Sequence, residues 1–346
     1  MTNNTFLAVD LPIIQAPMAG VQDSALAIAV SQAGGLGSLP CGMLGLEALQ
    51  TQLAAIKAQT SQPVNLNFFC HQAPEPDAKR EAQWRNVLQP YFNQYGIDAD
   101  AIKAGPGREP FNHDVADIVE QYRPAVVSFH YGLPTADLLA RVKGWGATVL
   151  SSATTIAEAQ WLEANGADGI IAQGLEAGGH RGMFLTADLT TQMGTFALLP
   201  QVVKVVNIPV IAAGGIADAK DVAAALSLGA VAAQVGTAYL LCDEANTSQL
   251  HRAALQGDSR HHTAITNLFS GRPARGIVNR VINEIGPLSD SAPEFPLASV
   301  AITALRQQAE AAGSADFSPL WSGQNTSGCQ AVSAAVLTRA LVGKSL

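Results

Sequence analysis

The chain has 346 residues, of which 48% are hydrophobic and 31 are glycine. This length suits one large domain or two ordinary ones, and the glycine content is typical of an α/β protein with many tight turns. The formal net charge is −8 at pH 7, and the 20 lysines and arginines are scattered, so no basic stripe is available to bind a nucleic-acid backbone.

Cysteine and histidine spacing gives no reason to expect a metal. The four cysteines lie far apart and form no Cys-x-x-Cys pair, which indicates reduced thiols and argues against a zinc site or a disulfide framework: Cys41, Cys70, Cys242 and Cys329. We expect the adjacent His261 and His262, and the group Arg272, Arg275 and Arg280, to lie on a solvated surface.

The first ten residues lack a basic segment followed by a long apolar run, so no signal peptide is expected. No apolar stretch reaches the roughly 18–20 residues that a membrane-spanning helix needs. We therefore expect a cytoplasmic protein that does not bind membranes.

Short apolar runs alternate with helical patterns over most of the chain. Eight runs predict strands at 13–16, 36–38, 64–68, 125–129, 148–151, 169–172, 210–213 and 232–235. Most are apolar on consecutive residues, as parallel strands buried on both faces require. Helical patterns lie between them at 25–32, 47–58, 135–144, 156–165, 196–206 and 219–228. This alternation predicts a TIM (β/α)₈ barrel of the α/β class, with a doubly wound open sheet as the alternative.

Two stretches fall outside the repeat. Residues 70–124 include Pro74, Pro76, Pro106 and Pro110 and a helical pattern at 78–95, which suggests an insertion that acts as a functional loop or lid. Residues 241–346 look mainly helical. The sequence thus predicts a barrel over 1–240 and a C-terminal lobe over 241–346 that covers the barrel mouth.

Residues just after each barrel strand are candidates for the active site, because that end of the barrel carries the chemistry. The sixth strand runs into a glycine-rich segment with a histidine: Gln173, Gly178, Gly179, His180 and Arg181. Glycines let the backbone approach a ligand, and an imidazole can exchange protons near neutral pH. We therefore predict that His180 is catalytic, although many histidines are structural.

The seventh and eighth strands end in Gly214 and Gly215, and in Gln234, Val235, Gly236 and Thr237. Barrels commonly hold phosphate on backbone amides after these two strands, backed by a helix N-terminus. The pattern predicts a phosphate site, with two ordinary glycine-rich turns as the alternative.

Three other strand ends give weaker signals. Ala16, Pro17 and Met18 follow the first strand, where small residues would let a flat ligand approach or would simply form a tight turn. Asn65 and Asn67 flank Leu66 on the third strand, so one of them points inward and could hydrogen-bond a polar ring or could simply form a turn. Ser128 and His130 share one face of the fourth strand, and each could line a pocket or be structural.

Taken in order, these segments resemble the class I nitronate monooxygenases of the 2-nitropropane dioxygenase family. The similar segments are 15–20, 65–69, 128–132, 173–182, 212–216 and 234–237, and 320–324 resembles the family's C-terminal Trp-x-Gly-Gln segment. Together they extend over most of the chain.

The resemblance implies an FMN enzyme that oxidises alkyl nitronates, such as propionate 3-nitronate, with O₂ to a carbonyl compound and nitrite. It implies FMN contacts from Asn67, Gln173, Gly178, Gly215 and 234–237, with Met18 near the flavin ring and Ser322, Gly323 and Gln324 capping the cofactor. His180 matches the catalytic histidine, and Arg181 could attract the nitro group.

Two other functions stay open. Flavin-dependent enoyl-ACP reductases and NADH:quinone reductases have similar barrels and would consume NAD(P)H, without needing a Gly-x-Gly-x-x-Gly fingerprint. A non-catalytic phosphate-ligand binder would keep the glycines but have no use for His180. The physiological substrate and the oligomeric state are not predicted, and a homo-oligomer is compatible with the sequence.

Overall fold

The computed structural model describes residues 5–103 and 108–344. Eight parallel strands form its main sheet, in the order β1-β9-β8-β6-β5-β4-β3-β2. Their bounds are β1 Ile13–Gln15, β2 Gly37–Pro40, β3 Val64–Phe69, β4 Val126–His130, β5 Thr148–Ala153, β6 Gly169–Gln173, β8 Val210–Ala213 and β9 Ala232–Val235. A parallel bridge joins Ile14 to Leu36, next to β2, and Gln15 donates its amide to the Leu36 carbonyl at 2.9 Å. The sheet therefore closes into a barrel, which excludes the doubly wound alternative.

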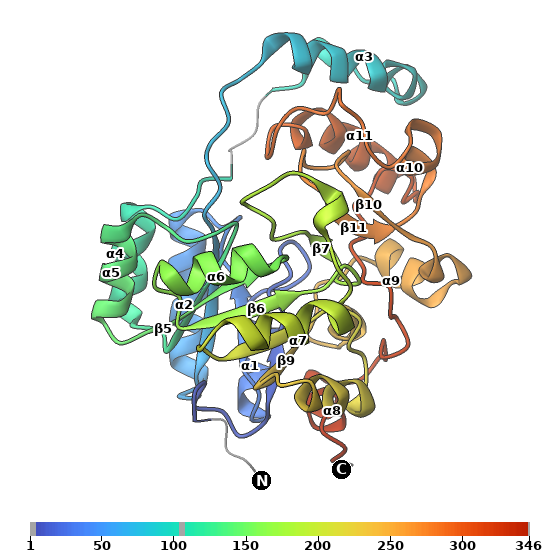
Figure 1. Ribbon diagram of the computed structural model, residues 1–346. Helices are drawn as coiled ribbons and strands as arrows, with labels where there is room; N and C mark the ends of the chain where they lie inside the picture. The colour runs from blue at the N-terminus through green and yellow to red at the C-terminus, as the bar shows by residue number, and fades with distance from the viewer. Residues whose placement is uncertain (1–4, 104–107, 345–346) are drawn as a thin grey trace.

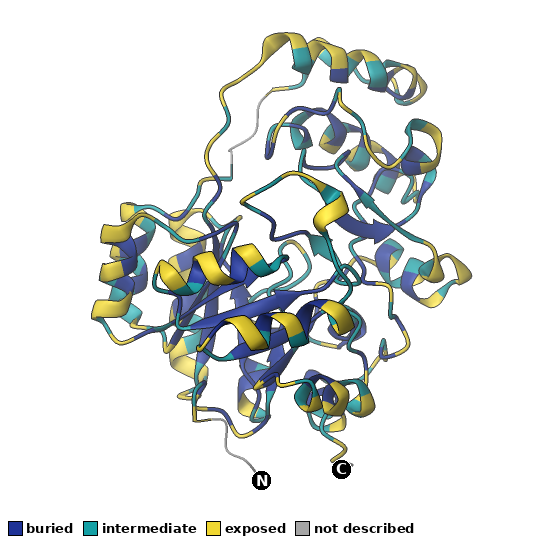
Figure 2. Ribbon diagram, in the orientation of Figure 1, coloured by how far each residue is buried: buried dark blue, intermediate teal, exposed yellow. Residues whose placement is uncertain are grey.

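Seven helices cover the outside of this barrel, as Figure 1 shows. They are α1 Ser24–Gln32, α2 Leu46–Gln59, α4 His113–Tyr122, α5 Ala136–Gly144, α6 Ile156–Ala164, α7 Thr195–Val205 and α8 Ala219–Ser227. Figure 2 shows that their outer faces are exposed while the strands beneath are buried. Helix α4 was not predicted, because it lies in the segment expected to be an insertion; it packs between α2 and α5 as the crossover from β3 to β4.

The barrel interior has an apolar floor and a polar upper layer. Alternate residues of each strand point inward, and at the lower level these are aliphatic, including Ile14, Val126 and Ile211. Leu7 and Val9 join this cluster from the N-terminal segment. Nearer the carboxyl ends of the strands the inward positions become Asn67, Ser152, Gln173 and Gln234. The sequence thus fills the bottom of the barrel and leaves polar groups at its mouth.

A second, antiparallel sheet links the barrel to the C-terminal residues. It has the order β10-β11-β7, with β10 Thr263–Thr266, β11 Ala274–Ile277 and β7 Gly179–His180. In this sheet Ala274 is paired with His180 and Arg275 with Gly179. The segment after the sixth barrel strand is therefore also a strand of the C-terminal sheet.

Helix α3 (Ala78–Tyr95) belongs to the core of the C-terminal lobe. Its buried Trp84, Leu88 and Phe92 share a hydrophobic cluster with residues of α10 (Arg280–Ile285) and α11 (Ser299–Ala311). The indole of Trp84 donates to the Ala298 carbonyl at 3.2 Å, and α3 lies beside α11 in Figure 1. The segment 70–124, which was predicted to act as a loop or lid, thus contains a helix, α3, that is packed into the C-terminal lobe.

The remaining helices are α9 (Gln249–Gln256), α12 (Ala334–Ala340) and four short 3₁₀ turns: η1 Ala99–Ala101, η2 Leu189–Thr191, η3 Thr237–Leu241 and η4 Asp258–His261. Helix α12 packs against α1 on the side of the barrel, where Thr338 is hydrogen-bonded to the Tyr239 hydroxyl at 2.8 Å. This end of the chain therefore does not cover the mouth. The boundary between the barrel and the C-terminal lobe at residue 240 stays a prediction. Within residues 5–103 and 108–344, no helix is long and apolar enough to cross a membrane.

Candidate active site

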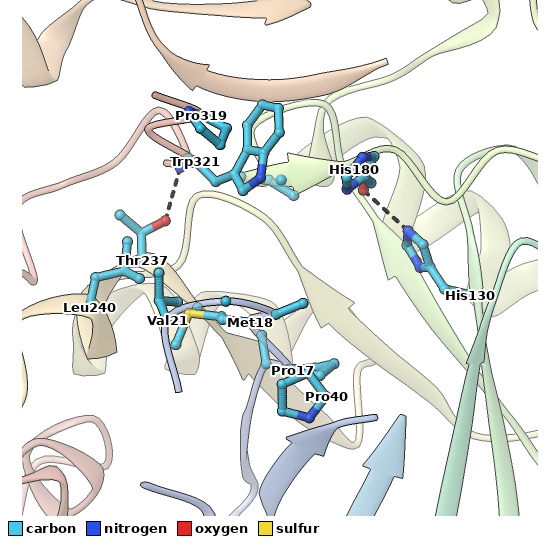
Figure 3. A pocket seen from close by; sticks show the side chains of 18 of the residues that line it. Pro17, Met18, Val21, Pro40, His130, His180, Thr237, Leu240, Pro319 and Trp321 are labelled. Atoms are coloured by element: carbon cyan, nitrogen blue, oxygen red, sulfur yellow. Dashed lines mark hydrogen bonds between the residues drawn. The ribbon is translucent and has the colours of Figure 1, made fainter. Parts of the chain in front are cut away.

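A cavity opens at the carboxyl ends of the barrel strands, under the C-terminal lobe. With its mouth it has about 1860 Å³ of free space. It is lined by most of the predicted site residues: Ala16, Pro17, Met18, Asn67, His130, Gln173, Gly178, Gly179, His180, Gly214, Gly215, Gln234, Gly236, Thr237 and Gly323. Figure 3 shows Met18 and Pro17 from the first strand end on one side of the cavity, and His180 and Trp321 on the other.

Arg181 does not line the cavity. It follows His180 directly, and neighbouring side chains of an extended segment point to opposite sides. Its guanidinium is fully buried and donates to the carbonyls of Gln173 and Gly174 at 2.7 Å, and to Gln192 at 3.0 Å. Arg181 therefore fixes the loop after β6 and is not placed to attract a substrate, contrary to the prediction.

Four other predicted residues also lie outside the lining: Ser128, Val235, Ser322 and Gln324. Val235 packs outward in the cluster between the barrel and its helices. Ser128 points inward but is covered, and its hydroxyl accepts from Asn67 at 2.9 Å. Ser322 is buried and Gln324 is exposed; between them, Gly323 reaches the cavity and donates its amide to the Thr237 hydroxyl at 2.9 Å.

His180 projects from β7 into an aromatic wall. Its ring centroid lies 5.4 Å from that of Trp321 and 5.5 Å from that of Phe295. Its Nε2 lies 2.7 Å from the Ser270 hydroxyl. Because Ser270 also donates to the Arg272 carbonyl at 3.3 Å, its lone pair is left to accept Nε2–H. This tautomer leaves the lone pair of His180 on Nδ1.

His130 holds the backbone of His180. Its Nε2 lies 3.2 Å from the His180 carbonyl and donates to it, so its Nδ1 accepts from the Ser152 hydroxyl at 3.1 Å. The side-chain amide of Gln173 donates from Nε2 to the same carbonyl at 2.9 Å. Both ring nitrogens of His130 are thus engaged, and it serves as a positioning residue.

Burial keeps both histidines neutral. It lowers the pKa of His130 to about 4, although the bond to the His180 carbonyl opposes the shift. Burial, and then the nearby positive charge of Arg108, hold the pKa of His180 well below the usual 6.5. The neutral imidazole of His180 has a free lone pair that can accept a proton, and the same burial disfavours the charged imidazolium that would result.

The glycine-rich ends of β8 and β9 form a cradle of backbone amides. Gly214 and Gly215 have φ of +121° and +73°, a left-handed conformation that side chains rarely adopt. The amides of Gly215, Ile216, Gly236 and Thr237 donate to no protein acceptor among the described residues. A concave group of free amides is suited to an anion such as a phosphate. The N-terminus of α8 adds little, because Asp218 accepts from its first amides.

Some site residues were missed by the sequence analysis. Ser270 and Trp321 contact His180 from the lobe, and Arg108 lines the cavity from the segment between β3 and β4. Arg272, which was expected on a solvated surface, is half-buried, with its guanidinium 4.2 Å from the Tyr131 ring centroid. Arg275 is buried and donates to the Leu175 carbonyl at 3.0 Å. None of these residues ends a barrel strand, and only Trp321 lies in a segment that the sequence analysis singled out, 320–324.

Comparison with known proteins agrees with this architecture. The nitronate monooxygenase of Paraburkholderia phytofirmans is 42% identical over 339 residues, 97% of this chain and 92% of that protein. The one from Pseudomonas aeruginosa is 40% identical, over 97% of this chain and 96% of that protein. A crystal structure of nitroalkane oxidase from Streptomyces ansochromogenes has a TM-score of 0.88 at 36% identity, with 97% of this chain and 95% of that chain covered. FabK from Thermotoga maritima has a TM-score of 0.73 at 25% identity, covering 98% of this chain and 93% of that chain.

The fold and the site define a (β/α)₈-barrel enzyme with a ligand cavity over the carboxyl ends of its strands. The family profile described as nitronate monooxygenase matches residues 2–343. The chain belongs to the nitronate monooxygenase family, which is a family of flavin-dependent oxidoreductases.

Proposed function

We propose that this protein oxidises alkyl nitronates with O₂ to a carbonyl compound and nitrite, using FMN. The observation that carries the proposal is the placement of a neutral, half-buried His180 in the same cavity as a cradle of free backbone amides. Family membership supports the reaction class, and the activities for which the relatives are named match it.

The residues of the cavity fit FMN. The free amides of Gly215, Ile216, Gly236 and Thr237 would hold its phosphate. Gln234 has a buried side-chain oxygen without a protein partner, which would accept a hydrogen bond from the cofactor. A Cβ built at Gly236 would lie 3.3 Å from the Ala16 Cβ and 3.8 Å from the Met18 sulfur, so glycine at this position lets the ends of β1 and β9 pack closely at the cavity wall. When bound, FMN would supply the electron transfer to and from nitronate and oxygen.

The protein would supply binding, orientation and proton transfer. His180 Nδ1 would take the α-proton when the substrate arrives as a neutral nitroalkane, whereas a nitronate needs no base. Ser270 would keep the Nε2–H tautomer in place. The rings of Trp321 and Phe295 would exclude water from the reacting carbon.

The direct test combines a spectrum with a nitrite assay. The purified protein should be yellow, release FMN on denaturation, and form nitrite from propionate 3-nitronate in air without NADH. A colourless protein that binds no FMN, or a flavoprotein that forms no nitrite, would contradict the proposal.

The likeness to FabK supports one competing function, an FMN-dependent NAD(P)H oxidoreductase of the enoyl-ACP reductase or quinone reductase type. The same assay separates the two activities. Stoichiometric NAD(P)H oxidation without nitrite would select the reductase.

A further inference from the structure

Three consecutive residues of the C-terminal lobe contact the loops that follow β6, β8 and β9. Gly323 reaches the loop after β9 through the amide bond already described. Gln324 donates its amide to the Glu176 carbonyl, after β6, at 3.0 Å. Asn325, which is half-buried and lines the cavity, donates Nδ2 to the Gly215 carbonyl, after β8, at 2.8 Å. The lobe therefore holds together the loops that surround the cradle of amides.

The chain on each side of Asn325 packs against these loops without room for a side chain. A Cβ built at Gly178 would lie 2.5 Å from the Gly323 nitrogen, and one built at Gly328 would lie 2.2 Å from the Ala217 carbonyl oxygen. Both neighbours are backbone atoms, which no side-chain rotation can move. The position of Asn325 above the loop after β8 is therefore fixed by backbone packing before its own side chain is considered.

The other contacts of the Asn325 side chain set its direction. Its Oδ1 accepts from the Ser327 hydroxyl at 2.7 Å and from the Ser327 amide at 3.2 Å, which leaves Nδ2 to face the Gly215 carbonyl. Nδ2 also lies 3.2 Å from the Asp221 carboxylate, and that carboxylate accepts from the Ala217 amide at 2.9 Å. Asn325 and Asp221 together thus hold both ends of the turn that follows β8.

The bond from Asn325 determines the direction of the Ile216 amide. Gly215 and Ile216 share one trans peptide, in which the C=O and the N–H point in opposite directions. No other donor of the described residues bonds the Gly215 carbonyl. A glycine has no side chain that restrains rotation of its backbone, so this peptide would turn more freely without Asn325. The Ile216 amide is one of the four free amides of the cradle.

We propose that Asn325 is a positioning residue for the phosphate of FMN, which it serves by holding the Ile216 amide in the direction that the phosphate requires. Without this restraint, binding of the phosphate would have to order the peptide, and that ordering lowers affinity. The inference rests on the FMN binding of the proposed function. It assigns a role to a residue that the sequence analysis did not single out.

The test compares FMN with riboflavin, which lacks only the phosphate. Flavin is removed from the full-length protein by dialysis against concentrated potassium bromide, and binding is measured from the quenching of flavin fluorescence. In Asn325→Ala, the Kd for FMN should rise about 5- to 20-fold, the scale of one lost hydrogen bond and one peptide to be ordered. The Kd for riboflavin should stay within about twofold. General structural damage would weaken the binding of both flavins alike.

A second variant and a matched control accompany this comparison. Asn325→Asp keeps the size of the side chain and the acceptor for Ser327 but removes the donor, so FMN binding should weaken at least as much as in Asn325→Ala. In Asn165→Ala, both Kd values should stay unchanged. Asn165 is exposed at the end of α6 and is the matched control, because its Nδ2 also donates to a backbone carbonyl at 2.8 Å, that of Trp161, outside the cavity lining.

Unchanged FMN binding in either Asn325 variant would overturn the positioning role, and so would equal losses for FMN and riboflavin in Asn325→Ala. A protein that binds FMN and forms no nitrite would refute the proposed reaction, and the comparison of flavins would still decide the role of Asn325.

Inorganic phosphate is the probe if riboflavin or both flavins bind the unmodified protein too weakly to measure. A lack of FMN binding would refute the proposed use of FMN, but the cradle would still be tested by the anion alone. Phosphate should raise the thermal unfolding midpoint of the unmodified protein more than that of Asn325→Ala, because a ligand stabilises the folded protein according to its affinity. Equal shifts in the two proteins would refute the positioning role.

Discussion

His180 is fixed through its backbone as well as through its ring. Its carbonyl accepts from His130 and Gln173, its strand pairs with β11, and its Nε2 faces Ser270. The direction of the side chain is therefore set before any ligand binds. Such preorganisation is what a proton-transfer group requires, because a misplaced base loses much of its effect.

His180→Asn should separate the two forms of the substrate. Nitroalkane oxidation, which needs the α-proton to be removed, should fall by about 10²- to 10⁴-fold. Oxidation of the preformed nitronate should fall much less, because no base is required. Initial rates of nitrite formation from nitroethane and ethyl nitronate measure the ratio. Parallel losses on both substrates would show that His180 acts on binding and not as a base.

The residues of the site were predictable where they follow a barrel strand and not elsewhere. His180, Gly215 and Gly236 each follow a buried apolar run, so the sequence alone indicated them. Arg181 was misplaced because adjacency in the chain was taken for adjacency in the cavity, although the two-residue period puts it on the opposite side. Ser270 and Arg108 depend on how the lobe and the segment between β3 and β4 dock, and no local pattern encodes that.

At the scale of elements, helix α1 approaches β2 very closely. A Cβ built at Gly37 would lie 1.9 Å from the carbonyl oxygen of Ala27, a backbone atom that no side-chain rotation can move. Position 37 therefore admits only glycine unless α1 shifts. The contact lies beside the Ile14–Leu36 bridge that closes the barrel.

Gly37→Ala should therefore destabilise the protein by about 3 kcal/mol or more, the upper range for overpacking of a core. Gly144→Ala is the matched control: Gly144 ends α5, and nothing lies within 4 Å of its Cβ position. That change should leave stability unchanged or raise it by up to about 1 kcal/mol. Urea unfolding followed by circular dichroism measures both. A tolerated Gly37→Ala would show that α1 does not pack on β2 as described.

The barrel strands were predictable because each is a short apolar run followed by a glycine or a polar turn. All eight predicted runs overlap strands of the barrel, from Ile13–Gln15 to Ala232–Val235. The antiparallel strands were missed, since β7 has only two residues and β10 and β11 are short and follow the repeat. Helix α4 was missed because prolines earlier in the same segment suggested an irregular insertion.

At the scale of the whole molecule, several histidines are buried in the neutral form. Burial lowers the pKa of His130 and His251 to about 4, and that of His180 well below its usual value. In the unfolded chain each of these histidines has a pKa near 6.5. Below that pH the unfolded chain therefore binds protons that these imidazoles do not bind in the folded protein. The unfolded state therefore gains protons as the pH falls below about 6.5.

Stability should consequently fall between pH 6.5 and 4, by up to about 1.4 kcal/mol per pH unit for each such histidine. Above pH 7 their contribution should be constant. Urea unfolding midpoints at pH 7.5, 6.5, 5.5 and 5.0 measure how stability changes with pH. These values lie above the pH range in which most carboxylates titrate. A flat profile between 6.5 and 5.0 would mean that these imidazoles become protonated without unfolding.

The pairing of β7 with β11 has a consequence for the order in which the protein is made. His180 leaves the ribosome about ninety residues before the strand that fixes it, Ala274–Ile277, has been synthesised. In the last part of that interval, after Ala232–Val235 has emerged, all eight barrel strands have been made but β7 still lacks its partner strand. The segment that carries His180 should thus become ordered late in translation, when β11 emerges and pairs with β7.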